Sequence, residues 1–267
     1  MKSFAGKTLG WHLAHGVVEL TLNHEPANEI GTAMLADLEE FANAIPALAE
    51  DASACIILSA RPHGFSAGAD LRELYRGAAG LSAPERVAGA REFLERIHAV
   101  LNAIDSAALV TIAAVHGVCF GGGLELALAC DIIVADKMAR FAFPELRLGL
   151  IPGFGGTPRL SRDVGSATVR DLLFTGRSLN ATRAHALGLV AHLAAEGEAG
   201  NVARSIAAQI TKFDPAARAA AKKLIKPIPH EELRREIDSF CELFSRPTVM
   251  AALKKFVEST DVMPYLP

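Results

Sequence analysis

Residues 110–126 read VTIAAVHGVCFGGGLEL, and this stretch decides the fold class. Its first six residues form an apolar run, which is typical of a strand that is covered on both faces. Three consecutive glycines, Gly121 to Gly123, then turn the chain, and an apolar helix follows them. A strand that passes through a glycine turn into a helix indicates an α/β protein.

The same alternation continues on both sides of this stretch. Strands are predicted from period-two or wholly apolar runs at Val17–Leu22, Cys55–Leu58 and Ile132–Ala135. Thr32 is expected to cap a helix whose apolar residues recur at three- and four-residue spacing, and a second helix is expected over Pro84–Ile104. From about residue 200 only helices are predicted, at Val202–Ile210, Pro215–Leu224 and Glu231–Phe256, the last broken near Pro247. We therefore expect a core over residues 1–200 and a helical region over residues 201–267.

Composition narrows the class of protein. The chain has 267 residues, of which 51% are hydrophobic, and its formal net charge is −3. This charge gives no support for nucleic acid or an anionic membrane as a partner, and no apolar run reaches the length of a membrane span. The four cysteines form no CxxC pair, so no metal or redox motif is expected. Buried free thiols and the absence of an apolar secretory segment after Met1 favour a reducing, cytoplasmic location.

Three glycine-rich segments carry features that ordinary packing does not require. They are GFSAGADL at 64–71, HGVCFGGGLEL at 116–126, and FPELRLGLIPGFGGT at 143–157. The first is equally consistent with a simple tight loop. The second places backbone N–H groups at a helix start, where negative charge is favoured. It lacks the Lys-Ser/Thr of a phosphate loop and the GxGxxG spacing of a dinucleotide site.

Two carboxylates stand beside these glycines. Glu145 follows Pro144 on a turn, and Glu125 lies among Leu124, Leu126 and Leu128 in an apolar helix. A solvated surface position is therefore not expected for Glu125. His116, next to the glycine turn, is interpreted as a structural residue rather than a catalytic one. Glu73 is interpreted as a surface charge, with the wall of a binding pocket as the alternative.

Several ordered blocks together resemble the enoyl-CoA hydratase/isomerase (crotonase) superfamily. The blocks are FSAGADL, GGGLELALACDII, FPELRLGLIPGFGGTPRL, and the later Thr175–Arg177 and Ala184–Val190. They cover about residues 12 to 195. The resemblance implies a spiral of ββα units, with the C-terminal helices closing a homotrimer or a dimer of trimers.

The resemblance also implies a reaction, the addition of water to a 2-enoyl-CoA thioester or its reverse. In the family, two backbone N–H groups stabilise the thioester oxygen, and these correspond to Ala69 and Gly122. Glu145 matches the residue that delivers a proton to the alpha carbon, and Glu125 the residue that activates water. Coenzyme A is then part of the substrate, and no separate cofactor or metal is expected. The residues implied in substrate binding are Ala67, Gly68, Ala69, Asp70, Leu71, Arg72, Gly121 and Gly122.

Two departures from the family pattern concern the coenzyme A phosphates. Residues 26–30 read PANEI, without the lysine that many hydratases carry there. Residues 256–260 read FVEST in place of a frequent Lys-Arg pair, for which Lys254 or Lys255 can substitute. An acyl carrier protein, which bears the same pantetheine arm without adenine, is therefore an alternative carrier.

Other reactions on this scaffold remain alternatives, namely isomerisation, decarboxylation and hydrolysis. The retention of both Glu125 and Glu145 favours hydration, since isomerases often keep one of the pair. A non-catalytic RNA-binding or scaffold protein is the alternative from another class, and the net negative charge counts against it. The acyl pocket is expected around Leu74, Tyr75 and a loop at Gly77–Ala83.

Overall fold

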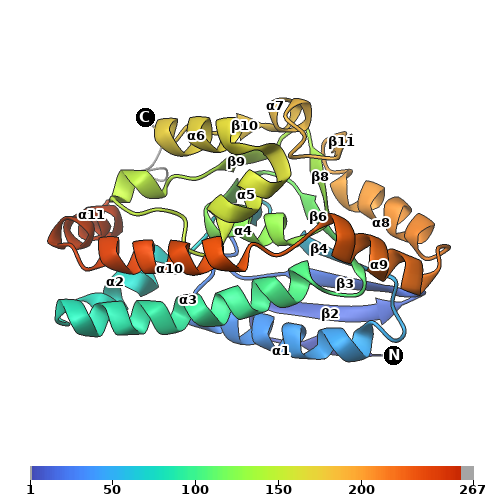
Figure 1. Ribbon diagram of the computed structural model, residues 1–267, viewed down its shortest axis with the longest axis horizontal. Coiled ribbons are helices and arrows are strands. Elements are labelled where there is room, and N and C mark those ends of the chain that lie inside the picture. The colour runs from blue at the N-terminus through green and yellow to red at the C-terminus, as the bar shows by residue number, and fades with distance from the viewer. Residues whose placement is uncertain (1, 260–267) are drawn as a thin grey trace.

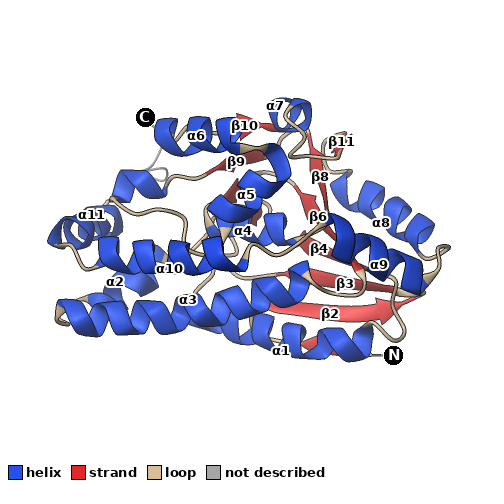
Figure 2. Cartoon of the chain, viewed as in Figure 1, coloured by secondary structure: helices blue, strands red, loops and turns tan. Residues whose placement is uncertain are grey.

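The computed structural model describes residues 2–259, which form two β-sheets surrounded by helices (Figures 1 and 2). The larger sheet has seven strands in the order β1-β2-β3-β4-β6-β8-β11, and the smaller has four in the order β10-β9-β7-β5. The strands are β1 (Ser3–Ala5), β2 (Leu9–Ala14), β3 (Val17–Leu22), β4 (Ala54–Ser59), β5 (Gly64–Ser66), β6 (Val110–Val115), β7 (Val118–Phe120), β8 (Ile132–Asp136), β9 (Arg140–Ala142), β10 (Leu179–Asn180) and β11 (His192–Ala194). The helices are α1 (Thr32–Leu48), α2 (Leu71–Ala78), α3 (Ala83–Asp105), α4 (Gly122–Ala129), the 3₁₀ turn η1 (Glu145–Leu148), α5 (Gly156–Val164), α6 (Ser166–Thr175), α7 (Ala181–Ala186), α8 (Ala199–Ile210), α9 (Pro215–Ile225), α10 (His230–Phe244) and α11 (Pro247–Glu258).

The two sheets are built from a repeated ββα unit. β4, β6 and β8 are parallel neighbours in the large sheet, and each is followed at once by a strand of the small sheet, namely β5, β7 and β9. These three short strands are again parallel neighbours, and helices follow each of them. The chain therefore advances through both sheets with every unit. This arrangement confirms the predicted α/β fold with ββα units.

The central strands of the large sheet, β4, β6 and β8, are buried on both faces, because their residues alternate between two cores. On β4, Cys55 and Ile57 belong to the main core, whereas Ala54 and Ile56 pack in a second core beneath α8. The residues of α8 that close this second core recur every three or four positions: Ala199, Ala203, Ala207 and Ile210. Figure 1 shows α8 on the side of the sheet away from α4 and α10. The wholly apolar run of β4 follows from burial on both faces.

The start of α1 differs from the sequence-based expectation. Gly31, not Thr32, is the N-cap residue, and no side chain caps it from within the same turn. The Thr32 N–H and hydroxyl both donate to Glu73 Oε1, and the N–H bond is 2.9 Å long. The prediction of a Thr32 cap was wrong because a carboxylate from α2 satisfies the free N–H group at this helix start.

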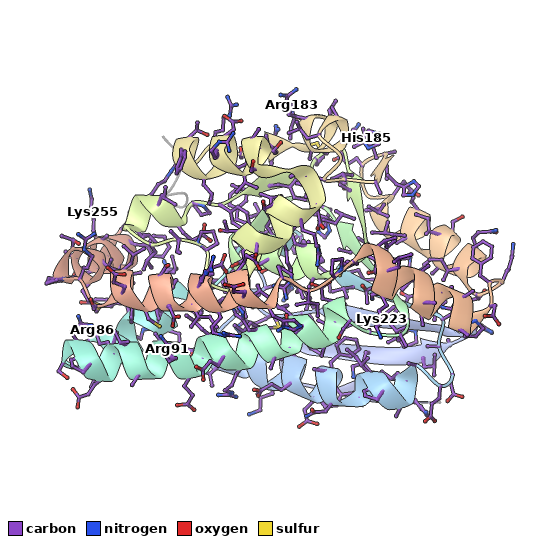
Figure 3. All side chains as sticks on the ribbon, viewed as in Figure 1. Arg86, Arg91, Arg183, His185, Lys223 and Lys255 are labelled. Atoms are coloured by element: carbon purple, nitrogen blue, oxygen red, sulfur yellow. The ribbon has the colours of Figure 1, made fainter. Side chains whose placement is uncertain are left out.

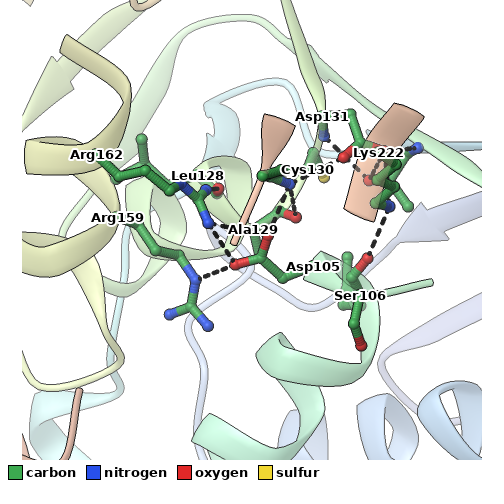
Figure 4. A network of polar contacts seen from close by, with 12 residues as sticks. Asp105, Ser106, Leu128, Ala129, Cys130, Asp131, Arg159, Arg162 and Lys222 are labelled. Carbon is green, nitrogen blue, oxygen red and sulfur yellow. Dashed lines mark hydrogen bonds and ion pairs between the residues drawn. The ribbon is translucent and has the colours of Figure 1, made fainter. Parts of the chain in front are cut away.

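A buried ionic network joins the C-terminal helices to the centre of the fold (Figure 4). Asp105, at the end of α3, contacts Arg159 Nε at 2.8 Å, Arg162 Nη1 at 3.1 Å and Lys226 Nζ at 2.9 Å. The side chains of Asp105 and Arg159 are fully buried. Burial alone would raise the pKa of Asp105, but the charges on Lys226, Arg159 and Arg162 hold it below its ordinary value. One carboxylate thus compensates several cations contributed by separate helices.

The periphery carries most of the remaining charge. Figure 3 shows Arg183 and Lys255 at the outline of the molecule, and Lys223 is exposed as well. Within residues 2–259, no helix combines the length and the apolar character that crossing a membrane requires.

Candidate active site

A cavity of about 300 Å³ lies where the starts of α2 and α4 meet η1, α3 and α10. Its wall is mostly apolar, as is usual for a pocket that binds an acyl chain or another apolar group. The large apolar residues of this wall are Ile30, Leu71, Leu74, Leu81, Phe93, Leu94, Leu148, Leu150, Ile151, Phe154, Phe240 and Phe244. All three glycine-rich segments of the sequence reach this one cavity.

Two backbone N–H groups without acceptors lie close together, one in the first segment and one in the second. Ile30 N donates to Gly68 O at 2.7 Å and Asp70 N donates to Ile30 O at 3.1 Å, so the intervening Ala69 N–H takes no part in this pairing. Gly122 is the first residue of α4, where N–H groups lack partners within the helix. Neither the Ala69 nor the Gly122 N–H group has an acceptor within the part of the chain that the structure describes.

Glycine is required for the close approach of these two segments. A Cβ atom at Gly68 would lie 2.8 Å from Phe120 O and 3.1 Å from Gly122 N. A Cβ atom at Gly122 would lie 2.6 Å from the Phe154 ring and 3.3 Å from Ala69 N. The backbone can therefore present two adjacent donors to one negatively charged oxygen, in the manner of an oxyanion hole.

Glu125 is buried in α4 and held by the third segment. Its Oε1 accepts hydrogen bonds from Phe154 N at 2.8 Å and from Gly156 N at 2.7 Å. Burial raises the pKa of Glu125 to about 7, although these two N–H groups and the charge on Arg159 act in the opposite direction. No residue of the described chain donates to Oε2, and Glu125 lines the cavity. The carboxyl group is therefore fixed by one oxygen and has the other available for a ligand.

Glu145 opens η1 and lines the same cavity. The residue is partly exposed as a whole, but its Oε2 is buried and has no hydrogen-bond partner among the described residues. Burial and the neighbouring charge of Glu125 raise the pKa of Glu145 well above its ordinary value. These surroundings favour the protonated form of the carboxyl group, which can act as an acid.

A third acid, Glu236 on α10, completes this group and was not predicted from the sequence. Its Oε1 accepts from Gly155 N at 2.6 Å and its Oε2 from Thr157 N at 3.0 Å. Burial and the charge of Glu125 raise its pKa to about 8. One signal was present in the sequence, because Glu236 lies three residues after Leu233 and four before Phe240, on the apolar face of α10.

Most of the residues implied in substrate binding line the cavity, and two do not. Ala67, Ala69, Asp70, Leu71, Gly121 and Gly122 all line it. Gly68 does not, and its N–H donates to Ser66 Oγ at 3.2 Å. Arg72 is exposed, and its guanidinium lies 5.7 Å from the centre of the Phe256 ring.

The structure also shows where the other residues singled out in the sequence lie. Asp70 caps α2, accepting from Glu73 N at 2.8 Å. Glu73 lines the cavity, so its interpretation as a plain surface charge was wrong. His116 lies outside the cavity lining and its Nε2 bonds to Arg61 O at 2.9 Å. The segment expected as a loop at Gly77–Ala83 begins inside α2, and Tyr75 is absent from the lining whereas Leu74 is present.

The four cysteines are free and buried. Among residues 2–259, no group of three or more histidine, cysteine, aspartate or glutamate side chains is placed to hold a metal ion.

Comparison with known proteins agrees with this geometry. The family model described as enoyl-CoA hydratase/isomerase matches residues 12–263. The chain is 36% identical over 231 residues to enoyl-CoA isomerase/hydratase fer4 of Mycosarcoma maydis, covering 84% of this chain and 81% of that protein. It is 34% identical over 249 residues to a probable enoyl-CoA hydratase of Bacillus subtilis (strain 168), covering 91% and 92%.

A solved structure supports the same assignment at the level of the fold. The crystal structure of enoyl-CoA hydratase from Bacillus halodurans superimposes with a TM-score of 0.82 at 25% identity, covering 93% of this chain and 99% of that one. The fold, the ordered glycine segments and the family match indicate the same family. This chain belongs to the enoyl-CoA hydratase/isomerase family.

Proposed function

We propose that the protein is a hydratase, which adds water across the double bond of a 2-enoyl-CoA thioester or catalyses the reverse dehydration. One observation carries this proposal: two carboxyl groups, Glu125 and Glu145, line the cavity that also holds the free N–H groups of Ala69 and Gly122. Members of this family act on acyl-CoA thioesters. Hydration needs a base that takes a proton from water and an acid that gives a proton to the alpha carbon. The two carboxyl groups can divide these tasks.

The proposed chemistry assigns each group one role. The thioester oxygen accepts hydrogen bonds from the Ala69 and Gly122 N–H groups, which stabilise the negative charge that develops as water attacks. Such donors contribute about 3 kcal/mol each to transition-state stabilisation. Glu125, ionised, takes a proton from water through Oε2 as the water adds to the beta carbon. Glu145, protonated, delivers a proton to the alpha carbon.

Turnover of crotonyl-CoA tests this proposal directly. We expect the absorbance of the conjugated thioester to fall as water adds to the double bond. A parallel assay with a 3-enoyl-CoA tests isomerisation, because the Mycosarcoma maydis relative carries both activities in its name. Isomerisation without hydration at micromolar enzyme would overturn the assignment in favour of an isomerase. The same assay with a crotonyl thioester of an acyl carrier protein tests the alternative carrier.

The pH dependence of hydration follows from the role of Glu125. As a base, Glu125 works only when ionised, and burial raises its pKa to about 7. We therefore expect kcat/KM to rise with pH through about 7 and to be lost as the pH falls below that value. A profile that stays flat down to the ordinary carboxyl pKa of about 4 would contradict this role.

The proposal extends to assembly into a homotrimer or a dimer of trimers. Leu224 and Ile225, at the end of α9, are 82% and 77% exposed, and contact with another subunit would shield them from water.

A further inference from the structure

The backbone of residues 154–157 runs between two carboxyl groups that come from helices far apart in the sequence. Glu125 of α4 accepts from the first and third N–H groups, those of Phe154 and Gly156. Glu236 of α10 accepts from the second and fourth, those of Gly155 and Thr157. The four successive N–H groups thus alternate between the two acids.

Arg159 Nη1 holds two carbonyls of this segment, those of Phe154 at 3.2 Å and Gly155 at 3.3 Å, whereas the four N–H groups are held by the two acids. The segment contains two consecutive glycines, and Gly155 adopts a left-handed φ of +98°. Glycine peptides rotate more freely than others because no Cβ atom restricts them. The direction of the Phe154 and Gly156 N–H groups, which fixes Glu125, therefore depends on how the intervening peptides are held.

Glu236 holds those intervening peptides from within the protein. It is 5% exposed and does not line the cavity, so its carboxyl group has no direct access to a bound ligand. The apolar face of α10 packs in the main core through Ile237, Phe240 and Phe244, which holds the helix in place. A rigid helix thus presents Glu236 to the segment.

We propose that Glu236 is a positioning residue, which fixes the backbone of residues 154–157 through the two N–H groups that Glu125 does not accept and thereby orients the Glu125 carboxylate. The inference rests on the proposed hydration, since Glu125 acts there as the base. A misplaced base slows the chemical step while the oxyanion donors and the acyl wall continue to bind the substrate.

Substitution of Glu236 tests this role with a graded series. We expect Glu236→Ala to lower kcat by about 10-fold or more, up to the roughly 10²-fold cost of a misplaced catalytic group. Glu236→Gln keeps one carbonyl acceptor and should restore part of the loss. The matched control is Glu242→Gln, at an exposed position of the same helix, which should match the wild type. Circular dichroism and the affinity for butyryl-CoA should stay unchanged in all three variants.

A double-mutant cycle separates positioning from a general structural effect. If Glu236 acts through Glu125, then Glu236→Ala should cost no more than about twofold when Glu125 is already glutamine. A loss of equal size in both backgrounds would overturn the inference, as would full kcat in Glu236→Ala.

A readout without turnover keeps this test independent of the proposed function. Infrared difference spectra between the wild type and Glu125→Gln isolate the carboxylate stretch of Glu125, whose frequency depends on its hydrogen bonds. We expect this band to shift in Glu236→Ala and not in Glu242→Gln. Absence of hydration in the wild type would refute the proposed function alone, whereas an unshifted band would refute the role of Glu236.

Discussion

Glu125→Gln and Glu145→Gln should each depress hydration by about 10²- to 10⁴-fold, the usual contribution of general acid–base catalysis. The packing should survive, because glutamine has nearly the same shape. In the wild type, Phe154 N and Gly156 N donate to Oε1 of Glu125. The amide oxygen of glutamine at position 125 can accept the same two hydrogen bonds. The loss would therefore measure proton transfer, and steady-state kinetics with crotonyl-CoA would quantify it.

The double variant and a binding measurement sharpen this prediction. Residues that act as a unit are not additive, so the double variant should be little slower than the slower single one. Affinity for butyryl-CoA should change much less, because the proposed donors at Ala69 and Gly122 are backbone groups. Near-normal hydration in Glu125→Gln, with none in Glu145→Gln, would instead favour a one-carboxylate mechanism closer to an isomerase.

Asp105→Ala should lower the free energy of unfolding by about 3–5 kcal/mol. The substitution leaves Arg159 fully buried without its carboxylate, whereas Arg162 and Lys226 lose one partner each and keep Asp163 and Asp131. A buried charge that loses its partner retains its desolvation cost, so the penalty exceeds the net value of the pair. Urea-induced unfolding, followed by circular dichroism, provides the measurement.

Asp238→Ala is the matched control, because it removes an aspartate from an exposed ion pair. Asp238 and Arg91 keep 59% and 39% of their side-chain surface accessible, so this loss should be about 1 kcal/mol or less. Equal destabilisation by the two substitutions would show that the network around Asp105 behaves as a surface pair does.

The sequence predicts the long elements of this fold because their signals are local. β3, with Val18, Leu20 and Leu22 buried in alternation, lies at its predicted limits, and so does β6. The three-residue strands β5, β7 and β9 were not predicted, since a run such as Gly64–Ser66 is too short to show a period. Their partners are each other, in successive repeats, and such pairing is visible only in the folded chain.

The site shows the same division between local and distant signals. Burial of Glu125 was foreseen from its apolar neighbours on α4, and the structure confirms that burial. Glu236 sits in HEELRREIDSF, where five other acidic or basic residues make a solvated helix the obvious interpretation. Its partners are the N–H groups of Gly155 and Thr157, about eighty positions earlier in the chain. Thr32 was misread for a similar reason, because its acceptor Glu73 is 41 residues away.

The position of α10 also bears on how the protein matures during synthesis. Phe240 and Phe244 form one wall of the cavity, and they leave the ribosome after every other lining residue. Until then, the nascent chain carries the opposite wall, including Phe93 and Leu94 on α3, without its cover. Chains are made at roughly 5–20 residues per second, and incompletely packed apolar surface favours aggregation and chaperone binding during that interval. The cavity is thus closed only after α10 has been made, when α11 is the one described helix that remains to be added.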